Sequence, residues 1–281
     1  MLSPSDREYI SSRAYVSEQV VDYVAAVSET EPFLFMEHVL YVKGEVLIFV
    51  GYPLDGAFTE ERLQRCLEGA AAQFRPRTLS LIAPRMPDWK KQAERGRGDA
   101  YYRLDLRSLN PGSKVMNMVR RASTEISCER GNELQEEHIQ MVGDFVKGRD
   151  LDEGTRFIFG RVPHYVSTVP TALVFSARAR SGRLVAFTVA EYGTKEYAFY
   201  MFNFRSEGDT VPGASDLLLH EAMQTALKQR KPFMNLGLGI SEGVTFFKRK
   251  WRAQHFLDYE TCTYRLSRSQ LLDWLSIFTR Q

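Results

Sequence analysis

Residues 171–238 contain a run of strand-length apolar segments that strongly limits the folds open to this chain. Three segments follow one another with short Gly-containing turns, and then come a small-residue turn, an amphipathic helix and a fourth segment. The predicted strands are Thr171–Arg178, Arg183–Tyr192, Glu196–Arg205 and Pro232–Leu238, and the predicted helix is Asp216–Lys228. Because short turns join antiparallel strands, the pattern predicts an α/β (α+β) unit with a mixed, mostly antiparallel sheet and helices on its faces.

The first 110 residues show a similar order of elements. We predict a helix over 17–28, strands over 33–41 and 45–52, a helix over 58–74, and strands over 77–83 and 101–106. The second half adds helices over 114–124 and 134–147, an irregular stretch over 148–169, a strand over 254–266 and a helix over 269–278. A chain of 281 residues is long enough for two domains, and we expect the boundary at Asn110, giving domains 1–110 and 111–281.

A small-residue turn precedes the helix that starts at Asp216. Its residues Gly213, Ala214 and Ser215 allow an anion to come close to backbone amides at a helix N-terminus, where negative charge is favoured. The alternative is ordinary capping, with Ser215 as the N-cap residue. The first half has no equivalent of this turn, so chemistry is expected in residues 111–281.

A basic-aromatic segment closes the same region. Phe247, Lys248, Lys250, Trp251 and Arg252 interleave cations with aromatic rings. Such a segment suits a phosphate-bearing ligand, and it equally suits a solvated basic helix face.

A lone polar residue interrupts the apolar strand upstream of this segment. Asn235 is predicted to lie in a buried strand, so its amide either bonds to neighbouring backbone or points at a ligand.

Two patches together carry a resemblance to a known group of proteins. The first patch runs from the small-residue turn through the helix and the Asn-Leu-Gly strand to the segment Gly-x-x-x-Phe-Lys-x-Lys-Trp, and the second is Gly112–Ala122. Together they resemble the GNAT acyltransferase superfamily over about residues 111–266. The version is that of the Fem-type transferases and the soluble domain of lysyl-phosphatidylglycerol synthases. The resemblance implies tandem GNAT-like domains, of which the N-terminal one is degenerate, and transfer of an acyl or aminoacyl group to an amine or hydroxyl.

The resemblance also implies roles for individual residues. The donor would lie between strands 196–205 and 232–238, against Tyr200, Met201, Phe202 and Asn203, with coenzyme A pyrophosphate at Gly213, Ala214 and Ser215. If the donor is aminoacyl-tRNA, Lys248, Lys250 and Arg252 would contact phosphates, and Phe247 or Trp251 would stack on a base. The lysine in the Phe-Lys position of Fem-type enzymes contacts a substrate phosphate, a role that carries over to Lys248.

Three polar residues on the central strands are candidates for catalysis. Acyl transfer needs orientation and oxyanion stabilisation, with a base for a protonated amine. Glu191 is the candidate base, and Tyr200 and Asn235 lie on the next two strands, where they are expected to converge with it. A second hypothesis is an inactive GNAT-fold module that binds RNA or an acidic partner through the basic-aromatic segment.

Composition and charge limit the classes of ligand, metal and cellular location expected for this chain. The net charge of +2, from 37 cations and 35 anions, does not indicate a general polyanion binder, so any contact with nucleic acid is expected to be a local patch. The 3 cysteines and 5 histidines show no ligand spacing, so we expect no metal and reduced cysteines. With no leader and no apolar run of about 20 residues, the chain is expected to be cytoplasmic, without an integral membrane segment. Its expected partners are a small-molecule, lipid or peptide amine acceptor and tRNA.

Overall fold

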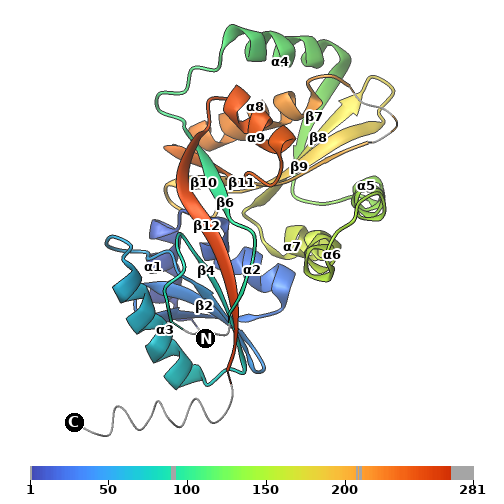
Figure 1. The fold of residues 1–281 in the computed structure, drawn as a ribbon. Helices are drawn as coiled ribbons and strands as arrows, with labels where there is room; N and C mark the ends of the chain where they lie inside the picture. The colour runs from blue at the N-terminus through green and yellow to red at the C-terminus, as the bar shows by residue number, and fades with distance from the viewer. Residues whose placement is uncertain (1, 90–92, 207, 209–210, 267–281) are drawn as a thin grey trace, which may run out of the picture.

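In the computed structural model, which describes residues 2–89, 93–206, 208 and 211–266, the strands form a single twelve-stranded sheet. The strand order is β1-β2-β3-β4-β12-β6-β11-β10-β9-β8-β7, and β5 pairs with β12 beside this path. Helices lie on both faces of the sheet (Figure 1). The predicted mixed, mostly antiparallel α/β architecture with flanking helices is confirmed.

The first half of the sheet is a meander followed by a helix and a parallel strand. Its elements are β1 (Glu31–Phe35), β2 (His38–Lys43), β3 (Val46–Val50), α3 (Glu60–Phe74) and β4 (Thr78–Ala83). The helix buries Leu63, Leu67 and Ala70 against one sheet face, at the helical spacing of an amphipathic sequence. The helices α1 (Pro4–Arg13) and α2 (Val21–Ser28), with the 3-10 turn Ser17–Gln19, lie on the other face.

The second half repeats this order on a larger scale. Its strands are β7 (Ile126–Gly131), β8 (Ala172–Ala179), β9 (Leu184–Glu191), β10 (Tyr197–Arg205) and β11 (Phe233–Leu238). One face is covered by α4 (Ser113–Glu125), α8 (Ala214–Lys228) and α9 (Glu242–Lys250), and the other by α5 (Glu136–Lys147), α6 (Glu153–Gly160) and α7 (Val162–Thr168). Every residue of β9 is buried, because both faces of this strand are covered.

Two strands join the halves. The strand β6 (Asp99–Asp105) pairs with β11 of the second half, although it precedes the expected boundary at Asn110. The long strand β12 (Gln254–Arg265) pairs first with β6 and then with β4 of the first half, so it crosses from one half into the other (Figure 1). The division into domains 1–110 and 111–281 therefore stays a prediction about sequence units, since the sheet itself is continuous.

Some local predictions differ from the structure. The expected strand over 33–41 is a hairpin, because Met36 adopts a left-handed conformation (φ 52°) and turns the chain. The expected irregular stretch over 148–169 contains α6 and α7. The segment between the expected strands 77–83 and 101–106 contains the short strand β5 (Ala93–Arg95). The predicted C-terminal helix 269–278 lies outside the described residues.

Candidate functional site

The strands β10 and β11 start as parallel neighbours and then separate. Their pairing runs only from Tyr197–Phe233 to Phe199–Asn235, although β10 continues to Arg205 and β11 to Leu238. A bulge at Met201 and the left-handed Gly237 (φ 74°) interrupt the ladders on the two sides of this gap. We call the separated part, residues 200–205 of β10 and 236–238 of β11, the open seam.

The N-terminus of α8 lies at the end of the open seam. Its N-cap is Gly213 (φ 85°), and no side chain caps the helix. The first-turn amides of a helix lack partners within the helix and carry partial positive charge. Asn203 Nδ2 of β10 donates to Ser215 Oγ at 3.0 Å, so the structure brings together two of the residues predicted to face the donor.

A buried carboxylate fastens α8 to the end of α9. Asp216 is 4% exposed, Lys250 Nζ lies 2.6 Å from its Oδ1, and Trp251 Nε1 donates to the same oxygen at 2.8 Å. We call Asp216, Lys250 and Trp251 the Asp216 cluster. Trp251 is fully buried and Lys250 is paired, so in this conformation neither side chain presents a free face for base stacking or a free charge for a distant phosphate.

Tyr200 has a buried hydroxyl group without a hydrogen-bond partner among the described residues. The side chain packs in the core under α8. Burial raises the pKa of Tyr200, the nearby Asp216 charge adds to this shift, and the Thr188 hydroxyl opposes it. The hydroxyl therefore stays protonated at neutral pH. A buried, unpartnered donor costs free energy, which a ligand carrying an acceptor oxygen would recover.

Glu191 and Asn235 lie on the opposite face of the sheet from Tyr200. Glu191 is fully buried, accepting from Tyr165 of α7 at 2.6 Å and from the Gly193 amide at 2.8 Å. Asn235 donates to the Tyr15 carbonyl at 2.9 Å and accepts from the Gly237 amide at 2.7 Å. The expected convergence of Glu191, Tyr200 and Asn235 is not seen, because neighbouring positions along a strand point to opposite faces.

Lys248 of α9 is 5% exposed, and its ammonium group reaches the end of β11. Its Nζ donates to the Leu238 carbonyl and lies 3.9 Å from the place that a Cβ on Gly237 would take. Burial lowers the pKa of Lys248 to about 7, although Asp99 opposes the shift. The amine is thus poised between its charged and neutral forms beside the open seam.

The rest of the basic-aromatic segment divides between core and surface. Phe247 packs against the second-half core, while Arg252 is exposed. Phe246, which was not among the predicted site residues, is 71% exposed and stands near exposed Arg249 in the sequence.

Comparison with known proteins identifies the architecture. No protein-family model and no curated protein sequence matches the chain. A solved structure of the C-terminal domain (DUF2156) of an Agrobacterium fabrum protein described as a lysylphosphatidylglycerol synthetase matches with a TM-score of 0.62 at 15% identity, over 98% of this chain and 95% of that one. FemX matches with a TM-score of 0.61 at 9% identity, over 99% and 98% of the two chains.

A tandem GNAT protein from the clavulanic acid pathway also matches, with a TM-score of 0.55 at 12% identity, over 81% of this chain and 78% of that one. The chain has the tandem GNAT and Fem-like fold. At such identities the likeness establishes the fold alone, so the activity has to be argued from the site.

In this GNAT and Fem-like fold, sequence reasoning missed a carboxyl group between the halves. Glu18 Oε2 accepts from the Tyr101 hydroxyl at 2.7 Å, and Tyr101 pairs with Leu238 of β11. On the other side, Tyr23 contacts the ring of Phe202 in β10, with centroids 6.1 Å apart, and the Glu18 charge adds to burial in raising the pKa of Tyr23. The neighbours of Glu18 thus contact both strands of the open seam.

The environment of Glu18 changes its acidity. Burial raises the pKa of Glu18, against the hydrogen bonds from Tyr101 and Ser17 that lower it. The sequence signal was weak, since a glutamate in a short polar turn normally faces solvent.

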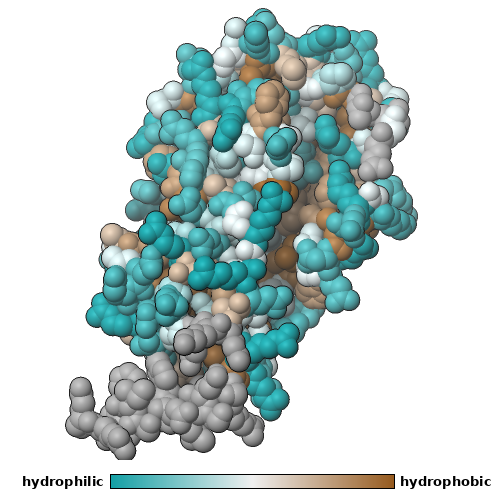
Figure 2. All heavy atoms as spheres, viewed as in Figure 1, coloured by the Kyte–Doolittle hydropathy of each residue, from teal (hydrophilic) through white to brown (hydrophobic). Residues whose placement is uncertain are grey.

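Figure 2 shows a hollow with hydrophobic residues near the middle of the molecule, where the two halves meet.

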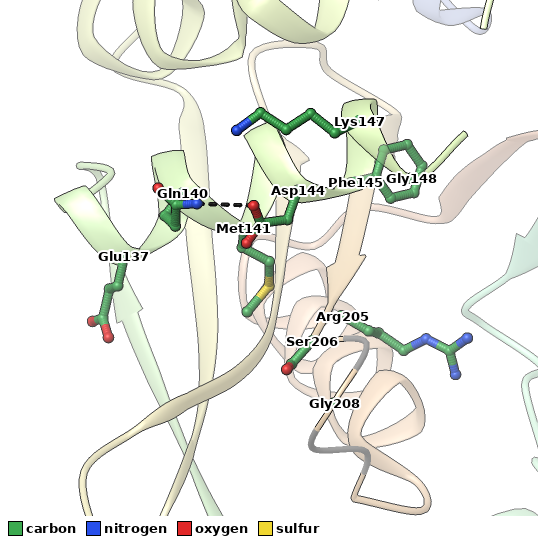
Figure 3. Close-up of a pocket in the computed structure, with 10 residues that line it drawn as sticks. All are labelled: Glu137, Gln140, Met141, Asp144, Phe145, Lys147, Gly148, Arg205, Ser206 and Gly208. Carbon is green, nitrogen blue, oxygen red and sulfur yellow. Dashed lines mark hydrogen bonds between the residues drawn. The ribbon is translucent and has the colours of Figure 1, made fainter. Parts of the chain in front are cut away.

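A separate hollow of about 540 Å³ lies between α5 and the end of β10. Gln140 donates to Asp144 on its α5 side, and Arg205 and Ser206 come from the end of β10 (Figure 3). None of its lining residues was a predicted site residue.

No helix in the described part of the chain is both long and apolar enough to cross a membrane.

Proposed function

We propose that this protein transfers an acyl or aminoacyl group from an activated, phosphate-bearing donor to an amine. The observation that carries the proposal is the open seam ending at the uncapped N-terminus of α8. Backbone groups on one side of β10 beyond Phe199 are free of β11 there and suit an amide-bearing arm of the donor. The first-turn amides of α8 suit its phosphate.

The fold supports two classes of donor. The matched structures include a GCN5-related N-acetyltransferase from Kribbella flavida as well as FemX. Acyl-CoA and aminoacyl-tRNA both join an activated carbonyl to a phosphate, the first through a long pantetheine arm and the second through the terminal ribose. The α8 N-terminus is compatible with a phosphate of either donor. Lys248 and Arg252 remain proposed phosphate contacts, and Lys248 lies at Leu238, beside the open seam. Lys250 would contact a phosphate only after leaving its ion pair with Asp216.

The chemistry follows from where the unpaired groups lie. The acceptor nitrogen attacks the donor carbonyl carbon, a C–N bond forms, and the C–S or C–O bond to the leaving group breaks. Tyr200, whose protonated hydroxyl has no partner among the described residues, donates a hydrogen bond to the oxygen that gains negative charge.

The proton lost by the attacking amine needs an acceptor. Glu18 takes it, because its raised pKa brings the carboxyl closer to the working pH and its neighbours contact both strands of the open seam. This assigns the base to the first half of the chain in place of Glu191. Both carboxylates accept hydrogen bonds, Glu18 from Tyr101 and Ser17 and Glu191 from Tyr165 and Gly193. Glu18 is chosen because its neighbours contact both strands of the open seam.

The test is a turnover assay on the full chain. Acyl-CoAs and aminoacyl-tRNAs are offered with primary-amine acceptors, and products are identified by mass spectrometry. Tyr200→Phe should lower kcat by about 10²-fold, as loss of one oxyanion donor does. Tyr264→Phe, which removes a hydroxyl from a buried tyrosine in the first-half core, is the matched control.

Glu18→Gln separates the base from a structural role. Loss of a positioned base should lower the rate by about 10²-fold or more and remove the acid limb of the pH profile. RNA binding without turnover for any donor would instead support the inactive module, for which the exposed Phe246, Arg249 and Arg252 supply a surface.

A further inference from the structure

Four potential metal ligands meet where the β1–β2 hairpin crosses α3. The turn residues are Met36 and Glu37, His38 starts β2, and Cys66 comes from α3. The left-handed backbone of Met36 (φ 52°) is unusual for a side chain of its kind. It places the thioether sulfur of Met36 3.5 Å from Cys66 Sγ.

The donor atoms lie at the separations that a shared metal ion requires. The ligand atoms of Glu37, His38 and Cys66 all lie within 4.8 Å of one another. Cys66 Sγ is 4.0 Å from Glu37 Oε1, and His38 Nδ1 is 4.0 Å from the same oxygen. Ligands at about 2.0–2.3 Å from one tetrahedral ion are about 3.3–3.8 Å apart. The 3.5 Å between the sulfur atoms of Met36 and Cys66 lies in this range, and the ligand atoms of Glu37, His38 and Cys66 would have to approach one another by about 1 Å or less.

The imidazole of His38 points independently to a missing partner. The residue is 1% exposed, and its Nδ1 is buried without a hydrogen-bond partner among the described residues. Its ring packs against Phe49 with centroids 5.1 Å apart, which holds it in place. Buried nitrogen atoms of this kind normally have a partner, and a metal ion would supply one.

Charge and ligand softness select the kind of ion. Glu37 already forms an ion pair with Arg62 Nε, so its negative charge is balanced. The remaining donors are one thiolate, one thioether and one neutral imidazole, a set that soft ions prefer. A monovalent ion beside one thiolate is electrically neutral, whereas a divalent ion would leave a positive charge next to Arg62.

We propose that Cys66, His38 and Met36 bind one Cu(I) ion, with Glu37 held beside it by Arg62. On binding, a Cu–S bond forms and the Cys66 thiol proton passes to solvent, without any change of oxidation state. Met36 is 62% exposed, so the ion enters from the surface by way of the thioether. This site lies in the first half of the chain and is separate from the open seam.

The proposed site departs from the expectation of no metal, which rested on the spacing of cysteines and histidines along the sequence. His38 and Cys66 come from different elements, and the hairpin that joins Met36 to them was predicted as continuous strand.

The experiment is an anaerobic titration of the full chain with Cu(I) against a chromophoric Cu(I) chelator. We expect one equivalent bound, with a thiolate-to-copper absorption band. Cys66→Ser should abolish binding, and Met36→Leu, at an exposed position, should weaken it by roughly tenfold or more. Cys262→Ser is the matched control, since Cys262 and Cys66 are both 2% exposed and share one core.

Each outcome decides the proposal. Equal chelator competition by the parent and the Cys66→Ser variant would overturn it, provided that both show the same circular dichroism spectrum. Tight binding of Zn²⁺ in place of Cu(I) would overturn the assignment of the ion. Retention of full affinity by Met36→Leu would overturn the role of the thioether and with it the soft ligand set.

Discussion

The two halves of the chain contain the same parallel strand pair, but only one of the pairs is open. In the first half, β3 and β4 pair without interruption from Val46–Thr78 to Val50–Ile82, and the Gly51 amide extends the contact to the Ile82 carbonyl at 2.7 Å. We call this pair the closed seam. In the second half, the pairing of β10 with β11 ends at Phe199–Asn235.

The helices that connect these strands also differ, because the N-terminus of one is capped by a side chain and that of the other is not. In α3 the N-cap Thr59 accepts from the Arg62 amide, which satisfies part of the helix N-terminus. In α8 the N-cap is Gly213, which has no side chain to offer. The comparison shows how one topology serves as scaffold in one half and as a candidate binding cleft in the other, through a bulge, a left-handed glycine and a missing cap.

The largest effect on stability is expected at the Asp216 cluster, which holds the α8 N-terminus in place. Asp216→Ala leaves the Trp251 Nε1 and the Lys250 ammonium without their acceptor, so the free energy of unfolding should fall by about 3–5 kcal/mol. Urea denaturation measures the loss. Asp216→Asn keeps an acceptor oxygen, so it should lower the free energy of unfolding by less than Asp216→Ala does.

The corresponding change at the closed seam is Thr59→Ala, which removes only a cap and should cost about 1 kcal/mol. Equal losses at Asp216 and Thr59 would contradict the difference drawn between the two helix N-termini.

A second prediction concerns the buried amine beside the open seam. The pKa of Lys248 is lowered from 10.5 to about 7 in the folded state, so between these values the unfolded chain binds more protons. The free energy of unfolding should therefore rise with pH from about 7 to 10.5, relative to Lys248→Met, by on the order of a few kcal/mol. Denaturation curves of both proteins across this range test the sign, and a falling difference would contradict the burial of the amine.

A smaller effect is expected where the closed seam is tightly packed. A Cβ on Gly51 would lie 2.8 Å from Ala83 Cβ and 3.1 Å from the Ile82 carbonyl oxygen. Gly51→Ala should destabilise the protein by about 1–3 kcal/mol through overpacking. Gly44→Ala has open space around its Cβ but sits at φ 58°, so it reports backbone strain without overpacking. A neutral Gly51→Ala would show that the seam is looser than described.

Much of the fold could be predicted because its strongest signals are local. The strands β8, β9 and β10 alternate with short turns, and the helices α3, α4, α5 and α8 show amphipathic spacing, so each was expected within a few residues of its bounds. The hairpin at Met36 was missed because its turn residues, Met36 and Glu37, include neither glycine nor proline, the residues that usually indicate a turn.

The candidate site was predicted in part. The turn at Gly213 and the pairing partners Asn203 and Ser215 come together because they are joined by one connection along the chain. Glu18 was missed because its place depends on contacts with Tyr101, 83 residues away. Glu191 was chosen for its position at a strand end, and the burial that satisfies it depends on α7, which was predicted as irregular.

The central claim, that the open seam ends in a phosphate-binding helix N-terminus, is tested most directly by ligand protection. Thermal unfolding of the full chain is measured with coenzyme A, acyl-CoAs and charged or uncharged tRNA, for the parent, Ser215→Asp and Thr59→Asp. We expect at least one donor class to raise the Tm of the parent and of Thr59→Asp but not that of Ser215→Asp, whose added carboxylate repels the phosphate. Equal protection of all three proteins, or protection of none, would contradict the claim.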